Sequence, residues 1–306
     1  MNSSNRNAMW KKFKQSRQLL LIFLPCAIFY AIFRYGPMFG LAMAFQNYSV
    51  YLGFFKSPWV WFKHFHKFFT SPDFFLLFKN TFLLGIYSLF WTFPFPIIFA
   101  LLLNELRNAR FKKAIQTVSF LPSFLSIVIV SSMLIDFLSL RSGIVNKVIA
   151  ALGFEKIYFM TKPEWFRTVY IGSEIWSQMG YGAIIYLASI AGIDPTLYEA
   201  AKVDGCSRLK SMWYITLPSM MPTIATMFIL RSGNIFRIGY EKILLLYNPS
   251  TYKVADIFST YVYRKGLMDR NYSYAAAVGL FESVVALVLI VITNRISKKL
   301  SDESIW

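Results

Sequence analysis

The sequence contains few charged residues, few cysteines and few histidines for its length. Charged side chains make up 15% of the 306 residues, and cysteine and histidine occur twice each, whereas an average soluble domain has about 25% charged residues. The two cysteines, Cys26 and Cys206, cannot form a disulfide framework and have no metal-ligand spacing. The chain also lacks the G-x-x-x-x-G-K-[ST] loop with which many ATPases hold phosphate. We therefore expect no metal site, no disulfide-stabilised secreted domain and no ATP hydrolysis by the chain itself.

Apolar residues are abundant and clustered in long runs. Hydrophobic side chains make up 56% of the residues, and the mean hydropathy is +0.48. A helix needs about 20 apolar residues to cross the hydrocarbon core. Three runs of this length carry at most one charge, 81–103, 117–135 and 274–293, and three more are interrupted by polar residues, 19–45, 168–193 and 220–246. The sequence therefore predicts an all-α, polytopic integral membrane protein with about six transmembrane helices, forming one domain over residues 1–306.

The distribution of lysine and arginine indicates how the spans are oriented. With the amino terminus inside the cell, the segments 1–18, 104–116, 192–218 and 295–306 hold 15 basic residues in 70 positions, against 12 in 86 in the opposite segments. Basic residues favour cytoplasmic loops, so we expect both termini and the loop 192–218 to be cytoplasmic. The net charge of +17 fits this bias together with contacts to anionic lipid. Basic residues scattered among membrane loops argue against nucleic-acid binding.

The segment 52–75 is rich in aromatic residues but also contains lysine and two histidines. Aromatic rings gather at the level of the lipid headgroups, so the segment is typical of a helix lying in the membrane interface. His64 and His66 are two residues apart and would bind a metal only with further ligands, so we favour interfacial packing.

The loop 192–218 has the capping residues of a short helix. Asp194 is a good N-cap, Pro195 suits the first helical position, and Gly205 can end a helix in the left-handed conformation. The sequence therefore predicts a helix that starts after Asp194 and ends before Gly205.

A second short helix is expected to follow this turn. Ser207 can cap it, and we expect Pro218 to stop it before the next span. Leu197, Ala200 and Ala201 would form a face of the first helix on which small side chains allow another surface to approach closely. Such a hairpin is too short to fold alone and is plausible as a docking element for a partner.

The same loop resembles the EAA motif of the permease subunits of ATP-binding-cassette (ABC) importers. That motif reads E-A-A, three residues, G, nine residues and I-x-L-P, and the spacing matches throughout, with Cys206 where alanine is usual. The resemblance implies that these residues couple the chain to an ATPase: Glu199, Ala200, Ala201, Asp204, Gly205, Ile215, Leu217 and Pro218.

Other parts of the chain look like the LplB-type branch of carbohydrate permeases. The similar segments are Tyr35 to Phe45, Asn80–Thr81, Phe93 to Glu105 and Ala277 to Phe281. Members of that branch are associated with complex oligosaccharides and polysaccharide fragments, including uronate-containing ones. The resemblance thus implies import of oligosaccharides, some of them acidic and alginate- or pectin-like.

The resemblance also implies a fold, partners and a location. We expect the ABC type I importer permease fold in the cytoplasmic (inner) membrane of a bacterium. The expected partners are an ABC ATPase dimer, a second, homologous permease subunit and an extracytoplasmic solute-binding protein. No cofactor is expected on this chain, because ATP and Mg would be bound by the ATPase.

Polar residues inside the spans are candidates for a sugar path, because ionisable groups at membrane depth usually face a bundle interior or a water-filled pathway. The candidates are Glu174, Trp176, Gln178, Tyr181, Arg231, Asn234 and Tyr240. The alternative is structural pairing, of Glu174 with Arg231 or of Arg237 with Glu241. Unpaired arginines would favour an acidic substrate.

Other classes of membrane protein remain as alternatives. An ion-gradient-driven secondary transporter would show repeated halves, and we find no such repeat. A membrane-embedded enzyme would need a clustered catalytic set, which the sequence does not offer. For a structural scaffold the EAA match would be an accident.

Overall fold

The computed structural model describes residues 17–300 except positions 234 and 237, with side chains as far as Arg295. In this part of the chain the regular secondary structure is helical, and strand pairing is limited to one isolated bridge between Gln46 and Trp59. The predicted all-α class is confirmed.

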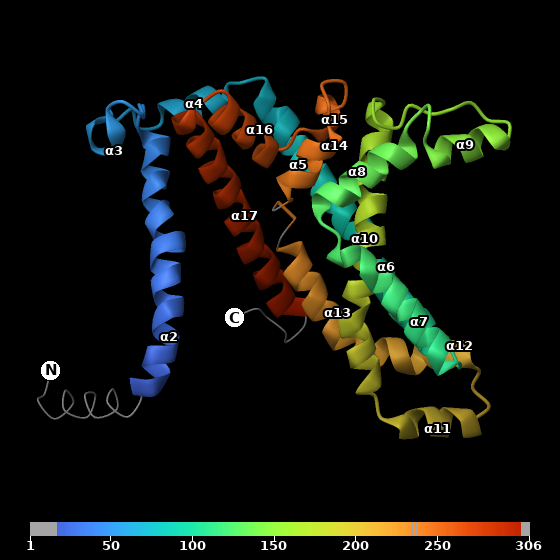
Figure 1. Cartoon of the computed structure of the whole chain (residues 1–306). Helices are drawn as coiled ribbons and strands as arrows, with labels where there is room; N and C mark the ends of the chain where they lie inside the picture. The colour runs from blue at the N-terminus through green and yellow to red at the C-terminus, as the bar shows by residue number, and fades with distance from the viewer. Residues whose placement is uncertain (1–16, 234, 237, 301–306) are drawn as a thin grey trace, which may run out of the picture.

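The helices that cross the molecule follow the order expected from the apolar runs. Four are long and apolar enough to span a membrane within the described residues: Arg17–Phe45, Asp73–Glu105, Arg208–Ser232 and Tyr272–Arg295. A bent pair, Ala109–Phe124 with Ile127–Leu138, is long and apolar enough to count as a fifth when its two parts are taken together. The 29-residue α10 (Pro163–Ala191) is more polar but also runs between the two ends of the molecule (Figure 1). About six spans, as expected, is therefore a fair description.

These crossings are assembled from shorter elements. They are α2 (Arg17–Tyr30) with η1 (Ala31–Tyr35) and η2 (Gly36–Phe45), α5 (Asp73–Thr92) with α6 (Pro94–Glu105), α7 (Ala109–Phe120) with η3 (Leu121–Phe124) and α8 (Ile127–Leu138), α12 (Arg208–Ser211) with η4 (Met212–Thr216) and α13 (Leu217–Ser232), and α17 (Tyr272–Leu300). The connecting helices are α3 (Gly53–Lys56), α4 (Lys63–Phe69), α9 (Ile144–Ala151), α11 (Pro195–Val203), α14 (Tyr240–Leu246), α15 (Tyr252–Ala255), α16 (Phe258–Tyr263) and η5 (Arg264–Met268).

Two predicted spans have the wrong geometry. The run 117–135 is not a straight helix, because the chain bends by 101° between η3 and α8. Pro122 lies in the 3-10 turn before the bend, and the Ser126 side chain caps α8 by accepting a hydrogen bond from the Ile129 amide. A proline that ends one helix and a serine that starts the next thus make a corner inside an apolar run.

The predicted span 220–246 is also wrong in its bounds. The helix starts at Arg208, ends at Ser232 and is followed by a break before α14. Gly239 stands at the N-cap of α14 in an extended conformation. The polar and glycine residues in the second half of the run therefore interrupt the span, since they stabilise a continuous membrane helix poorly.

The helix α10 lies at the centre of the bundle and contacts α5, α6, α7, α13 and α15. Its Gly180 packs directly against the backbone of Ser119. Gly85 of α5 similarly lies against the backbone of Ile235. Small residues at such crossings let membrane helices approach closely, so the first contact holds α10 beside the bent pair and the second holds α5 beside the break after α13.

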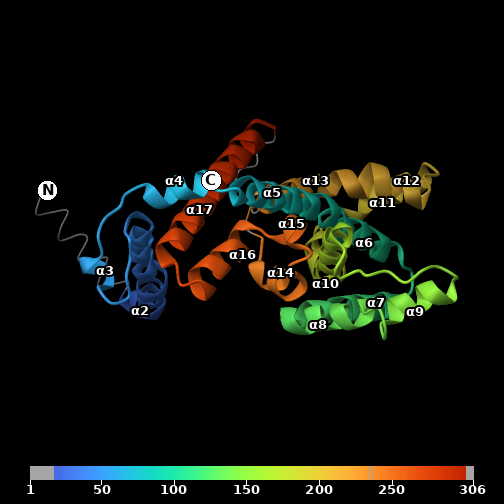
Figure 2. The same cartoon turned by 90° about the horizontal axis from the view of Figure 1, so that it is seen from above.

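The two ends of the molecule differ in the elements they carry. Helices α4, α15 and α16 lie at one end, whereas α11 lies at the other (Figure 1). The helix α2 begins, and α17 ends, toward the end with α11 (Figure 1). Figure 2 shows α2 at the edge of the molecule, and none of its residues is buried. Its continuation η2 packs on α17.

Candidate coupling hairpin and polar cavity

The first helix of the hairpin, α11, starts at the predicted cap. The Asp194 side chain accepts a hydrogen bond of 2.9 Å from the Thr196 amide, and Pro195 occupies the first turn. Because this bond stabilises the ionised carboxylate, it holds the pKa of Asp194 below its ordinary value. The predicted N-cap is confirmed.

The end of α11 is a left-handed turn at Gly205. Its φ is +73°, a conformation that L side chains rarely adopt. The Cys206 amide donates to the Ala201 carbonyl at 2.8 Å, which satisfies a carbonyl at the helix end. No atom stands within 4 Å of where a Gly205 Cβ would be, so the demand for glycine comes from the backbone alone. The predicted helix end is confirmed.

The second helix starts as predicted but does not stop at Pro218. Ser207 caps it by accepting from the Lys210 amide at 3.4 Å. The helix then passes through the π turn η4 and continues to Ser232. Pro218 sits in the first turn of α13 directly after the wider π turn, where its missing N–H costs little. The prediction that Pro218 ends the helix is wrong, and the hairpin is joined to the span without a break.

The EAA-like residues fall on three parts of this unit. Glu199, Ala200 and Ala201 lie on α11, Asp204 and Gly205 form the turn, and Ile215, Leu217 and Pro218 belong to the continuing helix. Glu199 and Ala200 are exposed, and the nearby Val203 is 88% exposed. The Tyr198 hydroxyl lies 2.9 Å from the Thr216 hydroxyl and ties α11 to the long helix. The outer face of α11 is thus open while its inner side is anchored.

A polar cavity of about 230 Å³ lies where α13 ends. Its walls come from α5, α10 and the segment after α13: Gly85, Ser88, Leu89, Thr92, Tyr170, Glu174, Arg231, Ile235, Ile238 and Gly239. The Arg231 guanidinium donates to the Thr92 hydroxyl at 3.2 Å. Two of the predicted path residues, Glu174 and Arg231, therefore line one cavity inside the bundle.

Glu174 forms an ion pair with a lysine that the sequence reasoning missed. The Lys242 ammonium lies 2.7 Å from the Glu174 carboxylate, and the lysine side chain is only 3% exposed against 29% for the glutamate. The same ammonium stands 5.0 Å from the Tyr170 ring centroid, within cation–π range. The alternative pairing of Glu174 with Arg231 is wrong, because Glu174 is held by Lys242.

The remaining path candidates lie elsewhere. Tyr240 stacks on Tyr263 with ring centroids 5.8 Å apart, and it lines a separate cavity of about 580 Å³ together with Glu282. The α10 residues Trp176, Gln178 and Tyr181 are exposed on the surface of this single chain. Asn234 and Arg237 lie outside the described residues. The structure thus brings together two of the predicted path residues.

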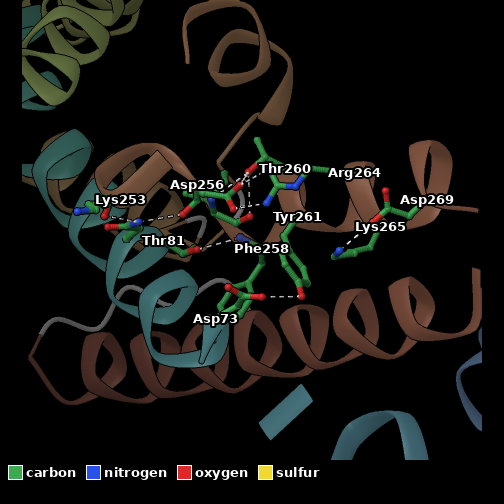
Figure 3. Close-up of polar contacts among 12 residues, drawn as sticks. Asp73, Thr81, Lys253, Asp256, Phe258, Thr260, Tyr261, Arg264, Lys265 and Asp269 are labelled. Carbon is green, nitrogen blue, oxygen red and sulfur yellow. Dashed lines mark hydrogen bonds and ion pairs between the residues drawn. The ribbon is translucent and has the colours of Figure 1, made fainter. Parts of the chain in front are cut away.

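A buried polar network at the end opposite α11 was also missed (Figure 3). Asp256 accepts from the Thr260 hydroxyl at 2.7 Å and forms an ion pair with Arg264. The Asn80 side chain donates to the Asp256 carbonyl, and Arg167 donates to the Asn80 side-chain oxygen. These contacts connect α5, α10 and the segment after α15. The partners of Asn80 lie 87 and 176 residues away along the chain, so no local sequence pattern predicts these contacts. An asparagine in an apolar run does indicate a buried polar contact, although not its partner.

Comparison with known proteins identifies close relatives. Residues 77–302 match the family described as "Binding-protein-dependent transport system inner membrane component". The chain is 46% identical to the polygalacturonan/rhamnogalacturonan transport system permease protein YteP of Bacillus subtilis (strain 168), over 98% of this chain and 94% of the relative. It is 44% identical to protein LplB of the same organism, over 96% and 92% of the two chains.

A solved structure has the same fold. A chain in the crystal structure of a bacterial ABC transporter involved in the import of the acidic polysaccharide alginate superposes with a TM-score of 0.89, at 44% identity over 96% of this chain and 99% of that one. Another structure of a bacterial alginate ABC transporter contains an alginate pentasaccharide-bound periplasmic protein and matches with the same TM-score of 0.89. The chain belongs to the family of inner membrane components of binding-protein-dependent transport systems, and it has the type I ABC importer permease fold.

Proposed function

We propose that this chain is one of two permease subunits of an ATP-driven importer of acidic oligosaccharides or polysaccharide fragments. The chain is a transport subunit and no enzyme, since ATP hydrolysis in its family resides on a separate subunit. The observation that carries the mechanism is the unbroken helix from the hairpin to the polar cavity.

That helix offers a direct mechanical connection between an ATPase and the path. The open face of α11 would dock into an ABC ATPase dimer, which would bind ATP and Mg. Tyr198 and the Gly205 turn fasten α11 to a helix whose last turn carries Arg231. At 1.5 Å per residue, the stretch from Arg208 to Arg231 is roughly 35 Å long. Closure of the ATPase dimer would therefore displace the cavity wall as well as the hairpin.

The proposed orientation rests on the positions of the first and last described helices. The start of α2, the end of α17 and the hairpin lie toward one end of the molecule (Figure 1). The lysine and arginine bias supports placing this end, with both termini, in the cytoplasm. The opposite end, which carries α4, α15 and α16, would then receive the solute-binding protein.

A second permease subunit would cover surfaces that this chain leaves open. No residue of α2 is buried, and Trp176 and Tyr181 of α10 are 44% and 59% exposed. Lipid can cover apolar side chains, but the aromatic rings of Trp176 and Tyr181 are also suited to pack on a second subunit. We propose a homologous partner that closes the path from the other side.

The cavity supports an acidic substrate. Arg231 and Glu174 line the cavity, and Glu174 is neutralised by its ion pair with Lys242, so the Arg231 guanidinium gives the cavity a positive charge. Hydroxyl groups of Ser88 and Thr92 in the wall suit the hydroxyls of a sugar ring. The names of the pectin-related and alginate-related relatives agree with this chemistry.

The test is uptake into proteoliposomes that hold both permeases and the ATPase, with the solute-binding protein supplied on the receiving side. Without any ion gradient, we expect uptake of uronate oligomers that requires ATP and far exceeds uptake of neutral oligomers of equal length. Uptake driven by an ion gradient in the absence of ATP would instead identify a secondary transporter and refute the proposal.

A further inference from the structure

A cavity lies beside the coupling hairpin, and its lining includes none of the residues assigned above to ATPase coupling or to the sugar path. It has a volume of about 730 Å³ and lies between the turn after α6 and the inner side of the hairpin. It is lined by Asn104, Glu105, Leu106, Arg107, Tyr198, Lys202, Cys206, Ser207, Arg208 and Ser211. Two chain segments separated by about a hundred residues thus enclose one site at this end of the molecule.

The cavity is positively charged. Arg107, Lys202 and Arg208 face a single carboxylate, Glu105. None of the three basic side chains has a hydrogen bond or an ion pair with another residue in the described part of the chain. Glu105 is likewise not within ion-pair distance of any of them. Three cations gathered around one space repel each other, and an anion placed between them relieves that repulsion.

Two exposed apolar side chains follow the lining residue Arg208 along its helix. Leu209 and Trp213 are four residues apart on the helix that carries Arg208, so they share one face. They are 68% and 62% exposed. In the proposed orientation, on which this step depends, the site stands at the cytoplasmic membrane surface, where anionic lipids accumulate and basic pockets between helices hold their headgroups.

We propose that this cavity binds the phosphate headgroup of an anionic phospholipid of the inner leaflet, such as phosphatidylglycerol. The phosphate is bound by Arg107, Lys202 and Arg208, and an acyl chain lies along Leu209 and Trp213. The lipid bridges the turn after α6 and the base of the hairpin, so it steadies the hairpin from behind while α11 engages the ATPase.

The test uses the complete transporter complex in phosphatidylcholine vesicles. Association of spin-labelled phosphatidylglycerol relative to spin-labelled phosphatidylcholine is measured on the wild type and on Arg107→Gln, Lys202→Gln, Arg208→Gln and their combination. Since one basic residue contributes about fivefold to association with an anionic surface, we expect each single change to reduce the selectivity about fivefold and the triple change to abolish the selective component. The matched control is Arg110→Gln with Lys113→Gln and Lys210→Gln, which removes the same charge from exposed positions outside the cavity.

Each outcome decides the matter. An equal loss in the control triple would show a diffuse charge effect and overturn the site. Competition by inorganic phosphate as strong as by lipid would identify a soluble-anion site instead of a lipid site. Unchanged lipid selectivity with impaired ATPase assembly would assign the cavity to the ATPase and also overturn the proposal. If the triple variant fails to assemble, the single variants still carry the test. Lipid selectivity needs no turnover, so it is independent of whether the substrate proposal holds.

Discussion

Removing either partner of the ion pair between Lys242 and Glu174 should destabilise the assembled protein. The lysine side chain is 3% exposed and the glutamate 29%, so Lys242→Gln leaves a partly wetted carboxylate, whereas Glu174→Gln leaves a buried ammonium. Removing one partner of a buried pair costs about 3–5 kcal/mol. We expect the cost of Lys242→Gln to lie at or below the lower end of this range, because water reaches the Glu174 carboxylate. The cost of Glu174→Gln should lie toward the upper end, because the Lys242 ammonium is buried.

The double variant separates the two contributions. Lys242→Gln with Glu174→Gln leaves two neutral amides that can hydrogen-bond to each other, so most of the loss should be recovered. The measurement is the thermal unfolding midpoint and the yield of the purified complex for all four members of the cycle. Single variants as stable as the wild type, or a double variant worse than both singles, would refute the reasoning.

The same cycle tests whether Lys242 acts on substrate. If the lysine is purely structural, the double variant regains transport of acidic oligosaccharides along with its stability. If the lysine exchanges Glu174 for a sugar carboxylate, stability returns but selective transport of acidic sugars does not. A neutral oligosaccharide of equal length serves as the control substrate.

Four further changes have defined outcomes. Gly205→Val forces a branched side chain into a left-handed turn, which costs about 1–2 kcal/mol. Stimulation of the ATPase should therefore fall while the protein still inserts into the membrane. Unchanged stimulation would show that this turn has no role in coupling. Cys206 is partly exposed at the hairpin, so an impermeant thiol reagent should label it only from the cytoplasmic side, and labelling in intact cells would reverse the orientation. The Thr196 amide lowers the pKa of Asp194, so the cap is present at neutral pH and is lost as the pH falls through that lowered value. The protection of the Thr196 amide, its exchange rate relative to an unstructured peptide at the same pH, should then decrease, and Asp194→Asn should abolish this pH dependence. Arg231→Gln should weaken transport of uronate oligomers at least about tenfold, since hydrogen bonds to charged groups contribute roughly 1.5–3 kcal/mol, and it should have little effect on neutral oligomers. An equal effect on both would exclude carboxylate recognition.

The hairpin was predictable because its determinants are local. An aspartate cap, a proline in the first turn and a glycine with positive φ act within a few residues of each other, and each acts through the backbone. The structure shows the Asp194 bond and the Gly205 conformation as expected. Pro218 misled the sequence reasoning, because a proline is tolerated in a helix that widens into a π turn just before it.

The polar cavity was only partly predictable because its contacts are long-range. Glu174 and Arg231 are predicted to line the sugar path because they are charged residues within predicted membrane spans. Lys242 lies inside the run 220–246, which the hydropathy pattern predicts as one continuous span, and its partner Glu174 is 68 residues away. The break after Ser232 brings the lysine back beside α10, and a pattern of hydropathy does not contain that turn. The corner between η3 and α8 was missed for the same reason.

The long helix that links hairpin and cavity is built to bend as well as to transmit. It contains the π turn η4 and two prolines, Pro218 and Pro222, near the end that carries the hairpin. Missing backbone bonds and a widened turn lower the cost of bending there. The other end is held firmly, because Arg231 bonds Thr92 and Ser232 is buried. A pull on α11 would therefore be absorbed partly as a change of bend near Pro218, and only the remainder would reach the cavity wall. Stiffening the bend by replacing Pro222 with alanine should pass more of the motion to Arg231, whereas weakening the Tyr198 contact should pass less.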